Sequence, residues 1–184
     1  MPDAARVLPL DGIAPLIGPA LTMTPLAPCM RLILRGRAAA AAAAAAPALG
    51  MRLPVLACRS ARTGERAALW LGPDEWLILA PADDPLAATL AAALAGVAHA
   101  LVDVSHRQSG LSIAGSAAAT VLNAGCPLDL DHTAFPIGMC TRTVLAKSEI
   151  VLWRTGALAF RVEAGRSFVP YVWQYLAEAG REFG

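Results

Sequence analysis

The chain has 184 residues, which is enough for one domain or for two small lobes that share a core. Hydrophobic residues make up 57% of the chain and charged residues 16%, so an intrinsically disordered chain is excluded, and more apolar side chains are present than one small domain usually buries. The net charge of +1 excludes a general affinity for nucleic acid, because it leaves no broad basic surface.

Residues 1–28 are rich in proline and show no regular hydrophobic period. We expect them to form an extended arm that lies over its own domain or over another chain. Pro15, Pro19 and Pro25 interrupt any membrane-spanning helix, and the start of the chain lacks the basic region of a signal peptide. The four cysteines show no C-x-x-C spacing, which favours reduced thiols in a cytoplasmic protein that contacts no membrane.

The predicted regular elements begin with a short strand at 31–35. The alanine run at 38–46 favours a short helix because alanine has the highest helix propensity, although a disordered low-complexity insert is also compatible with this composition. A weak strand is predicted at 53–57. Two apolar runs, at 67–71 and 76–80, flank the turn residues Pro73 and Asp74 and predict a β-hairpin.

A second helix is predicted after Asp84-Pro85, because leucine recurs every four residues until Gly96. We then expect strands at 100–105 and 110–114 and a short helix that ends at Asn123. A three-stranded meander follows, with strands at 138–146, 149–154 and 158–163. A final helix is predicted from Ser167, as its capping residue, to about Glu182.

This order of elements predicts an α+β fold with a mostly antiparallel sheet and helices packed on it. Residues 29–184 are expected to form a single α+β domain, or two small lobes that meet near residues 97–100.

No set of residues predicts a catalytic, cofactor or metal site. Asp103, Ser105 and His106 are the residue types of a hydrolase triad, but triad members are usually distant in sequence, and in a strand His106 would point away from the other two. Cys126 and Cys140 could form a disulfide or a redox switch, or could be buried thiols. The sequence contains neither a G-x-G-x-x-G motif nor a Walker motif.

The last helix carries the strongest sign of a protein interface. Val169, Trp173 and Leu176 widen its apolar face beyond one ordinary stripe, which indicates either a second protein surface or an unusually broad core contact. Arginines at or after the meander could hold a carboxylate, reach across an interface or solvate the sheet. The interface candidates are therefore Trp173, Val169, Leu176, Arg142, Arg154 and Arg166.

Several blocks in the right order resemble the gamma subunit of heterotetrameric sarcosine oxidase over residues 66–183. They are Leu69–Leu77 (LWLGPDEWL), Val102–Gln108 (VDVSHRQ), Gly125–Leu130 (GCPLDL), Phe135–Thr143 (FPIGMCTRT), Ile150–Arg154 (IVLWR) and Arg166–Phe168 (RSF). The resemblance implies a non-catalytic assembly subunit with no cofactor of its own, in a complex with the alpha, beta and delta subunits. Such a complex oxidises sarcosine to glycine with release of hydrogen peroxide and 5,10-methylenetetrahydrofolate, and its FAD, FMN, NAD and tetrahydrofolate are implied to lie on other subunits.

The strand at Asp103 and the elements after it also resemble the folate-binding fold of the glycine-cleavage aminomethyltransferases. Those enzymes carry an Asn-Asp pair after the short helix, whereas this chain has Gly125-Cys126, with Asp129 three residues later. Two alternatives stay open on this basis. One is a stand-alone folate-binding one-carbon transfer protein that uses Asp129 or Asp103, and the other is a scaffold subunit of a different N-methyl amine demethylase.

Overall fold

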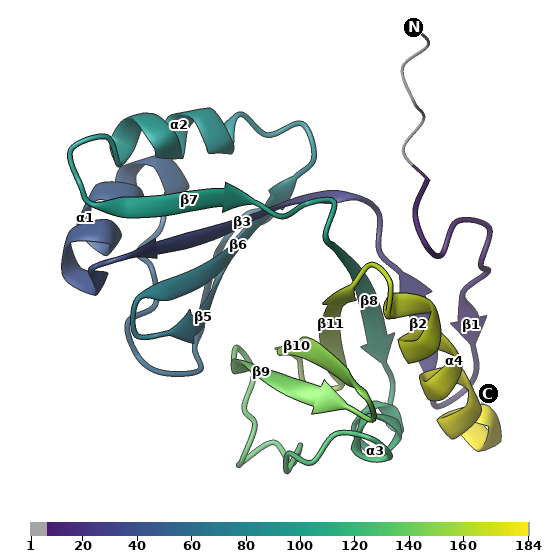
Figure 1. Ribbon diagram of the computed structural model, residues 1–184. Helices are drawn as coiled ribbons and strands as arrows, with labels where there is room; N and C mark the ends of the chain where they lie inside the picture. The colour runs from purple at the N-terminus through teal and green to yellow at the C-terminus, as the bar shows by residue number, and fades with distance from the viewer. Residues whose placement is uncertain (1–6, 184) are drawn as a thin grey trace, which may run out of the picture.

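The computed structural model describes residues 7–183 and contains two antiparallel sheets, each covered by helices on one face (Figure 1). The first sheet has the strand order β4-β5-β6-β3-β7 and the second has the order β1-β2-β8-β11-β10-β9. The strands are β1 Leu16–Ile17, β2 Thr22–Pro25, β3 Cys29–Gly36, β4 Ser60–Thr63, β5 Arg66–Gly72, β6 Glu75–Pro81, β7 His99–Asp103, β8 Gln108–Ala114, β9 Cys140–Leu145, β10 Ser148–Gly156 and β11 Ala159–Gly165. The helices are α1 Ala38–Leu49, α2 Leu86–Ala93, α3 Ala118–Asn123 and α4 Val169–Ala179, followed by a short 3₁₀ turn at Arg181–Phe183.

The first lobe comprises the first sheet with α1 and α2, which lie together on its outer face (Figure 1). The alanine run forms a helix, as predicted, and Ala41, Ala45 and Leu49 recur every four residues on its buried side. Gly50 ends the helix in the left-handed conformation, where its N–H reaches the carbonyl of Ala46. Trp76 of β6 is fully buried in this core and donates its indole N–H to the Pro54 carbonyl.

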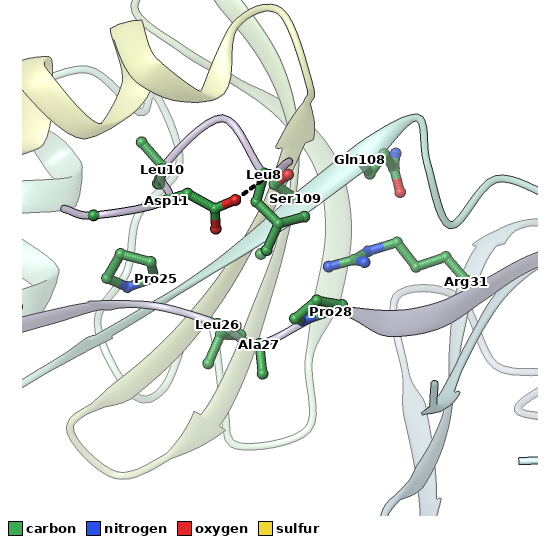
Figure 2. Close-up of a pocket in the computed structure, with 12 residues that line it drawn as sticks. Leu8, Leu10, Asp11, Pro25, Leu26, Ala27, Pro28, Arg31, Gln108 and Ser109 are labelled. Atoms are coloured by element: carbon green, nitrogen blue, oxygen red, sulfur yellow. Dashed lines mark hydrogen bonds between the residues drawn. The ribbon is translucent and has the colours of Figure 1, made fainter. Parts of the chain in front are cut away.

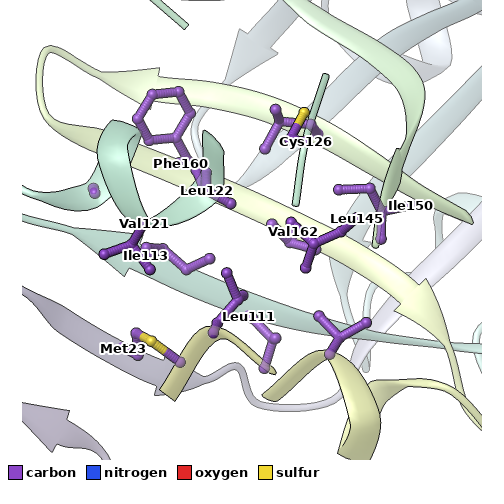
Figure 3. Close-up of a cluster of buried hydrophobic side chains, with 14 of the residues drawn as sticks. Met23, Leu111, Ile113, Val121, Leu122, Cys126, Leu145, Ile150, Phe160 and Val162 are labelled. Atoms are coloured by element: carbon purple, nitrogen blue, oxygen red, sulfur yellow. The ribbon is translucent and has the colours of Figure 1, made fainter. Parts of the chain in front are cut away.

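The second lobe comprises the second sheet with α3 and α4, which cover the face turned away from the first lobe (Figure 1). Its core is the larger of the two and draws on the arm, the sheet and both helices (Figure 3). Figure 3 labels its central members, which include Met23, Leu111, Ile113, Val121, Leu122, Leu145, Phe160 and Val162.

The described part of the N-terminal arm belongs to the second lobe. β2 pairs with β8 over four residues, from Thr22 opposite Ala114 to Pro25 opposite Leu111. Gly115 adopts a φ of +119°, and a Cβ atom built there would lie 2.2 Å from the Ala20 carbonyl oxygen. The arm is thus packed on its own domain, and the start of the arm, residues 1–6, lies outside the described residues.

A third cluster of buried side chains joins the two lobes. Leu69 and Leu77 of the first sheet pack against Val151 and Trp153 of β10, with Cys140 between them. The chain passes from the first sheet to the second between Asp103 and Gln108. The junction is therefore an apolar contact between two sheets, reinforced by ion pairs.

The predicted α+β class, the hairpin and the meander are confirmed, while two local predictions are wrong. Residues 53–57 form no strand, and a strand that was not predicted, β4, pairs with β5 from Ser60 opposite Leu69 to Thr63 opposite Arg66. Ser167 does not cap α4, because the helix begins at Val169 with Phe168 in the capping position. Pro170 stands in the first turn of this helix, where its missing N–H leaves no intrahelical hydrogen bond unmade. Of the helices in residues 7–183, none is long and apolar enough to cross a membrane.

Candidate interaction site

The apolar residues of α4 face the core of their own chain. Val169 and Leu176 are fully buried and Trp173 retains 8% of its surface, so these three interface candidates offer almost no surface to a partner. Together with Val172 they follow the i, i+3, i+4, i+7 spacing of one ordinary helix stripe. Phe168, by contrast, precedes the helix and is 51% exposed.

Arg154 is also an internal residue. It is buried, and its guanidinium donates to the carbonyls of Leu130 at 3.0 Å and Phe135 at 2.9 Å and lies 4.9 Å from the centre of the Phe160 ring. It donates further to the Ala157 carbonyl at 2.6 Å. The first two bonds satisfy carbonyls of the loop between α3 and β9 and the third one in the turn between β10 and β11, so Arg154 organises both segments and is not available to a partner.

The two remaining arginine candidates, Arg142 and Arg166, line one wide groove. Its walls are β9 and β10, the turn between β7 and β8, and the loop between β11 and α4, and residues 7–9 of the arm close one side. The groove encloses about 1140 Å³. Its charged or titratable lining residues are His106, Arg107, Arg142, Lys147, Glu149, Glu163 and Arg166.

Among the residues that line this groove, positively charged side chains outnumber the carboxylates that have no ion-pair partner. Glu163 is buried and already binds Arg31 at 2.7 Å and Arg161 at 2.6 Å, both from outside the groove lining. Within residues 7–183, no carboxylate lies within ion-pair distance of Arg107, Lys147 or Arg166. The groove thus has an excess of positive charge at its rim.

Arg142 belongs to both the groove and the junction between the lobes. Its guanidinium binds Glu75 of β6, which also accepts a 2.6 Å bond from Arg35 of β3. Hydrogen bonds from Arg142 and then Arg35 hold the pKa of the Glu75 carboxyl below its usual value, against the opposing effect of burial. One ionised carboxylate therefore ties β3, β6 and β9 together.

The groove also carries exposed apolar side chains between its charges. Val7 is 62% exposed, Val144 is 42% exposed and Phe168 is 51% exposed. Val144 lies on β9, which is the edge strand of the second sheet. Alternating cationic and apolar groups on an open surface are typical of a contact with another protein chain.

The turn beside the groove explains the triad-like residues found in the sequence. Ser105 is buried, its N–H donates to Asp103 Oδ1 at 2.8 Å, and its hydroxyl oxygen accepts from the Arg31 N–H at 2.8 Å. His106 points into the groove lining instead of toward the other two. The three residues shape the passage from β7 to β8 and do not form a hydrolase triad.

A smaller pocket of about 350 Å³ lies between the arm and β8 (Figure 2). Arg31 and Gln108 line it opposite apolar residues of the arm such as Pro25 and Leu26. Arg31 is neutralised by Glu163, and Asp11, which accepts a backbone N–H from Leu8, is a lining carboxylate without an ion pair among the described residues. Gln108 Oε1 is its one buried side-chain oxygen without a hydrogen-bond partner among the described residues.

The cysteines are free thiols in separate environments. Cys126 is buried in the core of the second lobe, whereas Cys140 is buried between the two sheets, so the two cannot form the disulfide considered from the sequence. Asp129 is exposed and accepts a backbone bond from Asp131 in its own turn. Residues 7–183 contain no group of three or more side chains able to hold a metal ion.

Comparison with protein families gives one match that covers most of the chain. The model described as the sarcosine oxidase, gamma subunit family matches residues 35–182. A sarcosine oxidase subunit gamma from Arthrobacter sp. is 40% identical over 137 residues, which are 74% of this chain and 68% of that protein. The subunit from Corynebacterium sp. (strain P-1) is 40% identical over 117 residues, which are 64% of this chain and 58% of the relative.

Two solved structures share the fold. A chain of the heterotetrameric sarcosine oxidase from Corynebacterium sp. U-96, in complex with pyrrole 2-carboxylate, is 33% identical, with a TM-score of 0.89 over 97% of this chain and 96% of that one. The glycine cleavage system aminomethyltransferase T from Bartonella henselae is 14% identical, with a TM-score of 0.67 over 86% of this chain and 45% of that one. The second match shows that the aminomethyltransferase fold predicted from the sequence is present.

Proposed function

The chain belongs to the sarcosine oxidase gamma subunit family, and from this premise we propose that it is the gamma subunit of a heterotetrameric sarcosine oxidase. The observation that carries the proposal is the full-length structural match to a chain of such a complex, with nearly equal coverage of both chains. The proposed role is assembly, in which the chain supports larger subunits that carry the chemistry.

The reaction proposed for the whole complex is the oxidative demethylation of sarcosine to glycine, with hydrogen peroxide and 5,10-methylenetetrahydrofolate as further products. Alpha, beta and delta subunits are the proposed partners, and FAD, FMN, NAD and tetrahydrofolate are proposed to bind to them. A cytoplasmic location is part of the same proposal. The groove with its exposed cationic and apolar rim supports an assembly role, because it offers this chain a surface for another protein.

No observation favours the stand-alone folate enzyme. Its candidate carboxylates, Asp103 and Asp129, lie in different lobes and line neither the groove nor the smaller pocket. The aminomethyltransferase match covers under half of that enzyme at 14% identity, so it supports the fold alone.

Co-expression tests the proposal directly. The tagged chain is produced with candidate alpha, beta and delta subunits from the same genome and purified through its tag. We expect a yellow complex that contains all four chains and releases hydrogen peroxide when sarcosine is added. A colourless 19.0 kDa species that never retains the flavoprotein subunits would contradict it.

A further inference from the structure

We propose that the groove between β9 and the loop before α4 binds an acidic, partly apolar segment of a larger subunit of the complex. This inference rests on the proposed function and specifies the surface and the partner chemistry through which assembly occurs. It follows from three properties of the groove, which are its charge, its exposed apolar residues and its size.

The charge of the groove indicates the chemistry of its partner. Arg107, Lys147 and Arg166 are exposed, line the groove and lack a carboxylate partner among residues 7–183. Only Glu149 opposes them with an exposed carboxylate, because Glu163 is buried and doubly paired. A concentration of unpaired cations on a chain of net charge +1 selects an acidic partner surface.

The fixed position of Arg166 strengthens this selection. Arg166 is held at the rim, because its guanidinium donates to the Val7 carbonyl and its N–H donates to the Arg107 carbonyl at 2.8 Å. The adjoining amino-terminal end of α4, with its positive helix dipole, lies beside Ser167 and Phe168 in the groove lining. The positive groups therefore occupy a surface with a largely preset backbone, which reduces the entropy cost of binding.

The apolar residues and the size favour a protein segment over a small anion. Val144 and Phe168 present exposed apolar surface between the cations, and a small anion would leave that surface wet. The groove volume of about 1140 Å³ exceeds the ~300–1,000 Å³ of typical small-molecule sites. A segment that alternates acidic and apolar side chains would satisfy both kinds of group.

Site-specific photo-crosslinking in the co-expressed complex tests the occupant. A benzophenone amino acid replaces Phe168 in one variant and Leu158 in another. Leu158 is 55% exposed but lies at the opposite end of β11 from the groove. We expect the probe at 168 to label an acid-rich segment of a larger subunit and the probe at 158 to give at least about tenfold less of that product. A product at 168 in a segment without acidic residues, or no product in an intact complex, would overturn the inference.

Charge reversal provides the second measurement. Arg107→Glu with Lys147→Glu should weaken binding of the chain to the other subunits by about tenfold or more and flatten the dependence of binding on salt. The matched control is Arg37→Glu with Arg52→Glu, two exposed arginines of the first lobe that make no ion pair among the described residues. Thermal melting of each purified variant shows whether it folds.

The outcomes separate this inference from the proposed function. If the unchanged chain assembles and the reversed groove binds equally well, the groove inference fails and the proposed function stands. If the unchanged chain assembles with no candidate subunit, both fail. If phosphate or an oligonucleotide binds to the groove while charge reversal leaves subunit binding unchanged, the inference is also overturned.

Discussion

At the scale of single residues, Gly110 marks the closest approach of β8 to the buried ion cluster. A Cβ atom built there would lie 2.9 Å from Glu163 Oε1 and 3.2 Å from Arg31 Nη2. Neither group can move freely, because Arg31 and Arg161 both hold the Glu163 carboxylate. The glycine is thus required by its neighbours in space, although its backbone angles are those of an ordinary strand residue.

Gly110→Ala should therefore destabilise the protein by about 1–3 kcal/mol, since the added methyl group has to displace a fixed ion pair. Urea unfolding followed by circular dichroism measures the change. Gly96→Ala is the matched control, because no atom lies within 4 Å of the Cβ position there. Equal urea midpoints for Gly110→Ala and Gly96→Ala would show that Glu163 and Arg31 shift to accommodate the added methyl group at little cost.

The reactivity of the thiols should follow their burial. Desolvation raises the pKa of the Cys140 thiol to about 12, so almost no thiolate exists there near neutral pH. We expect iodoacetamide at pH 8 to modify Cys29 and Cys58, which are partly exposed, and to leave Cys140 and Cys126 unmodified in the folded protein. Peptide mass spectrometry measures the extent at each site, and unfolding in guanidinium should make all four reactive. Rapid alkylation of Cys140 in the folded chain would contradict the burial between the sheets.

Residue patterns predicted the site only in part. Arg142 and Arg166 were expected at an interface and do line the groove, but Arg107, Lys147 and Phe168 were not singled out. Arg107 lies in the turn between β7 and β8, Lys147 in the turn between β9 and β10, and Phe168 in the loop before α4. The pairing of β8 with β11 brings Gln108 opposite Gly165, which places the turn before β8 beside the loop before α4. Val169, Trp173 and Leu176 were interpreted as a second apolar face, whereas together with Val172 they form the one buried stripe of α4.

At the scale of elements, the contacts that fix the two sheets against each other are ionic as well as apolar. Glu75 of β6 accepts bonds from Arg35 of β3 and Arg142 of β9. Its carboxylate is buried, whereas both guanidinium groups are more than half exposed. Solvent screening therefore limits how much these ion pairs contribute to the free energy of unfolding, even though they join three strands from two lobes.

Glu75→Gln should reduce the free energy of unfolding by about 1 kcal/mol at pH 7. The folded pKa of Glu75 lies below the unfolded value of 4.5, so its stabilising effect is present above pH 4.5 and is lost as the pH falls through the folded pKa. The difference between the original chain and the variant should therefore shrink below pH 4.5. Chemical unfolding from pH 7 to pH 3 measures it. Glu149→Gln removes an exposed carboxylate that makes no ion pair within residues 7–183 and should show no such trend. A Glu75→Gln penalty independent of pH would contradict the assignment.

Short-range elements were predictable because their signals are local. The hairpin of β5 and β6 follows from turn residues between two apolar runs, and α1 follows from alanine propensity together with Gly50. The pairing of β2 with β8 was not predictable, since it joins residues about 90 positions apart and Pro25 carries no strand signal. The strand β4 was missed for a related reason, because its four residues are polar or small and gain their place by pairing with β5.

At the scale of the whole molecule, the two lobes should behave as one folding unit. Trp153 is the largest side chain of the cluster between them, is 4% exposed and packs in the same cluster as Leu69 and Leu77. Its indole N–H donates to the Ser60 hydroxyl at 2.9 Å, which extends the contact to β4. The described part of the arm adds no second bridge through sheet pairing, because β1 and β2 pair only within the second sheet.

Trp153→Ala should consequently lower the stability by about 3–5 kcal/mol and separate the unfolding of the two lobes. Hydrogen exchange read by mass spectrometry distinguishes the lobes through peptides from β6 and from β11. In the original chain both sets should exchange through one common opening, whereas in the variant one set should exchange faster than the other. Trp153→Phe keeps most of the packing and loses the bond to Ser60, so it should cost about 1–2 kcal/mol while the lobes still open together. Independent exchange of the lobes in the original chain would show that the cluster between the sheets does not couple them, and that cooperativity comes from each core alone.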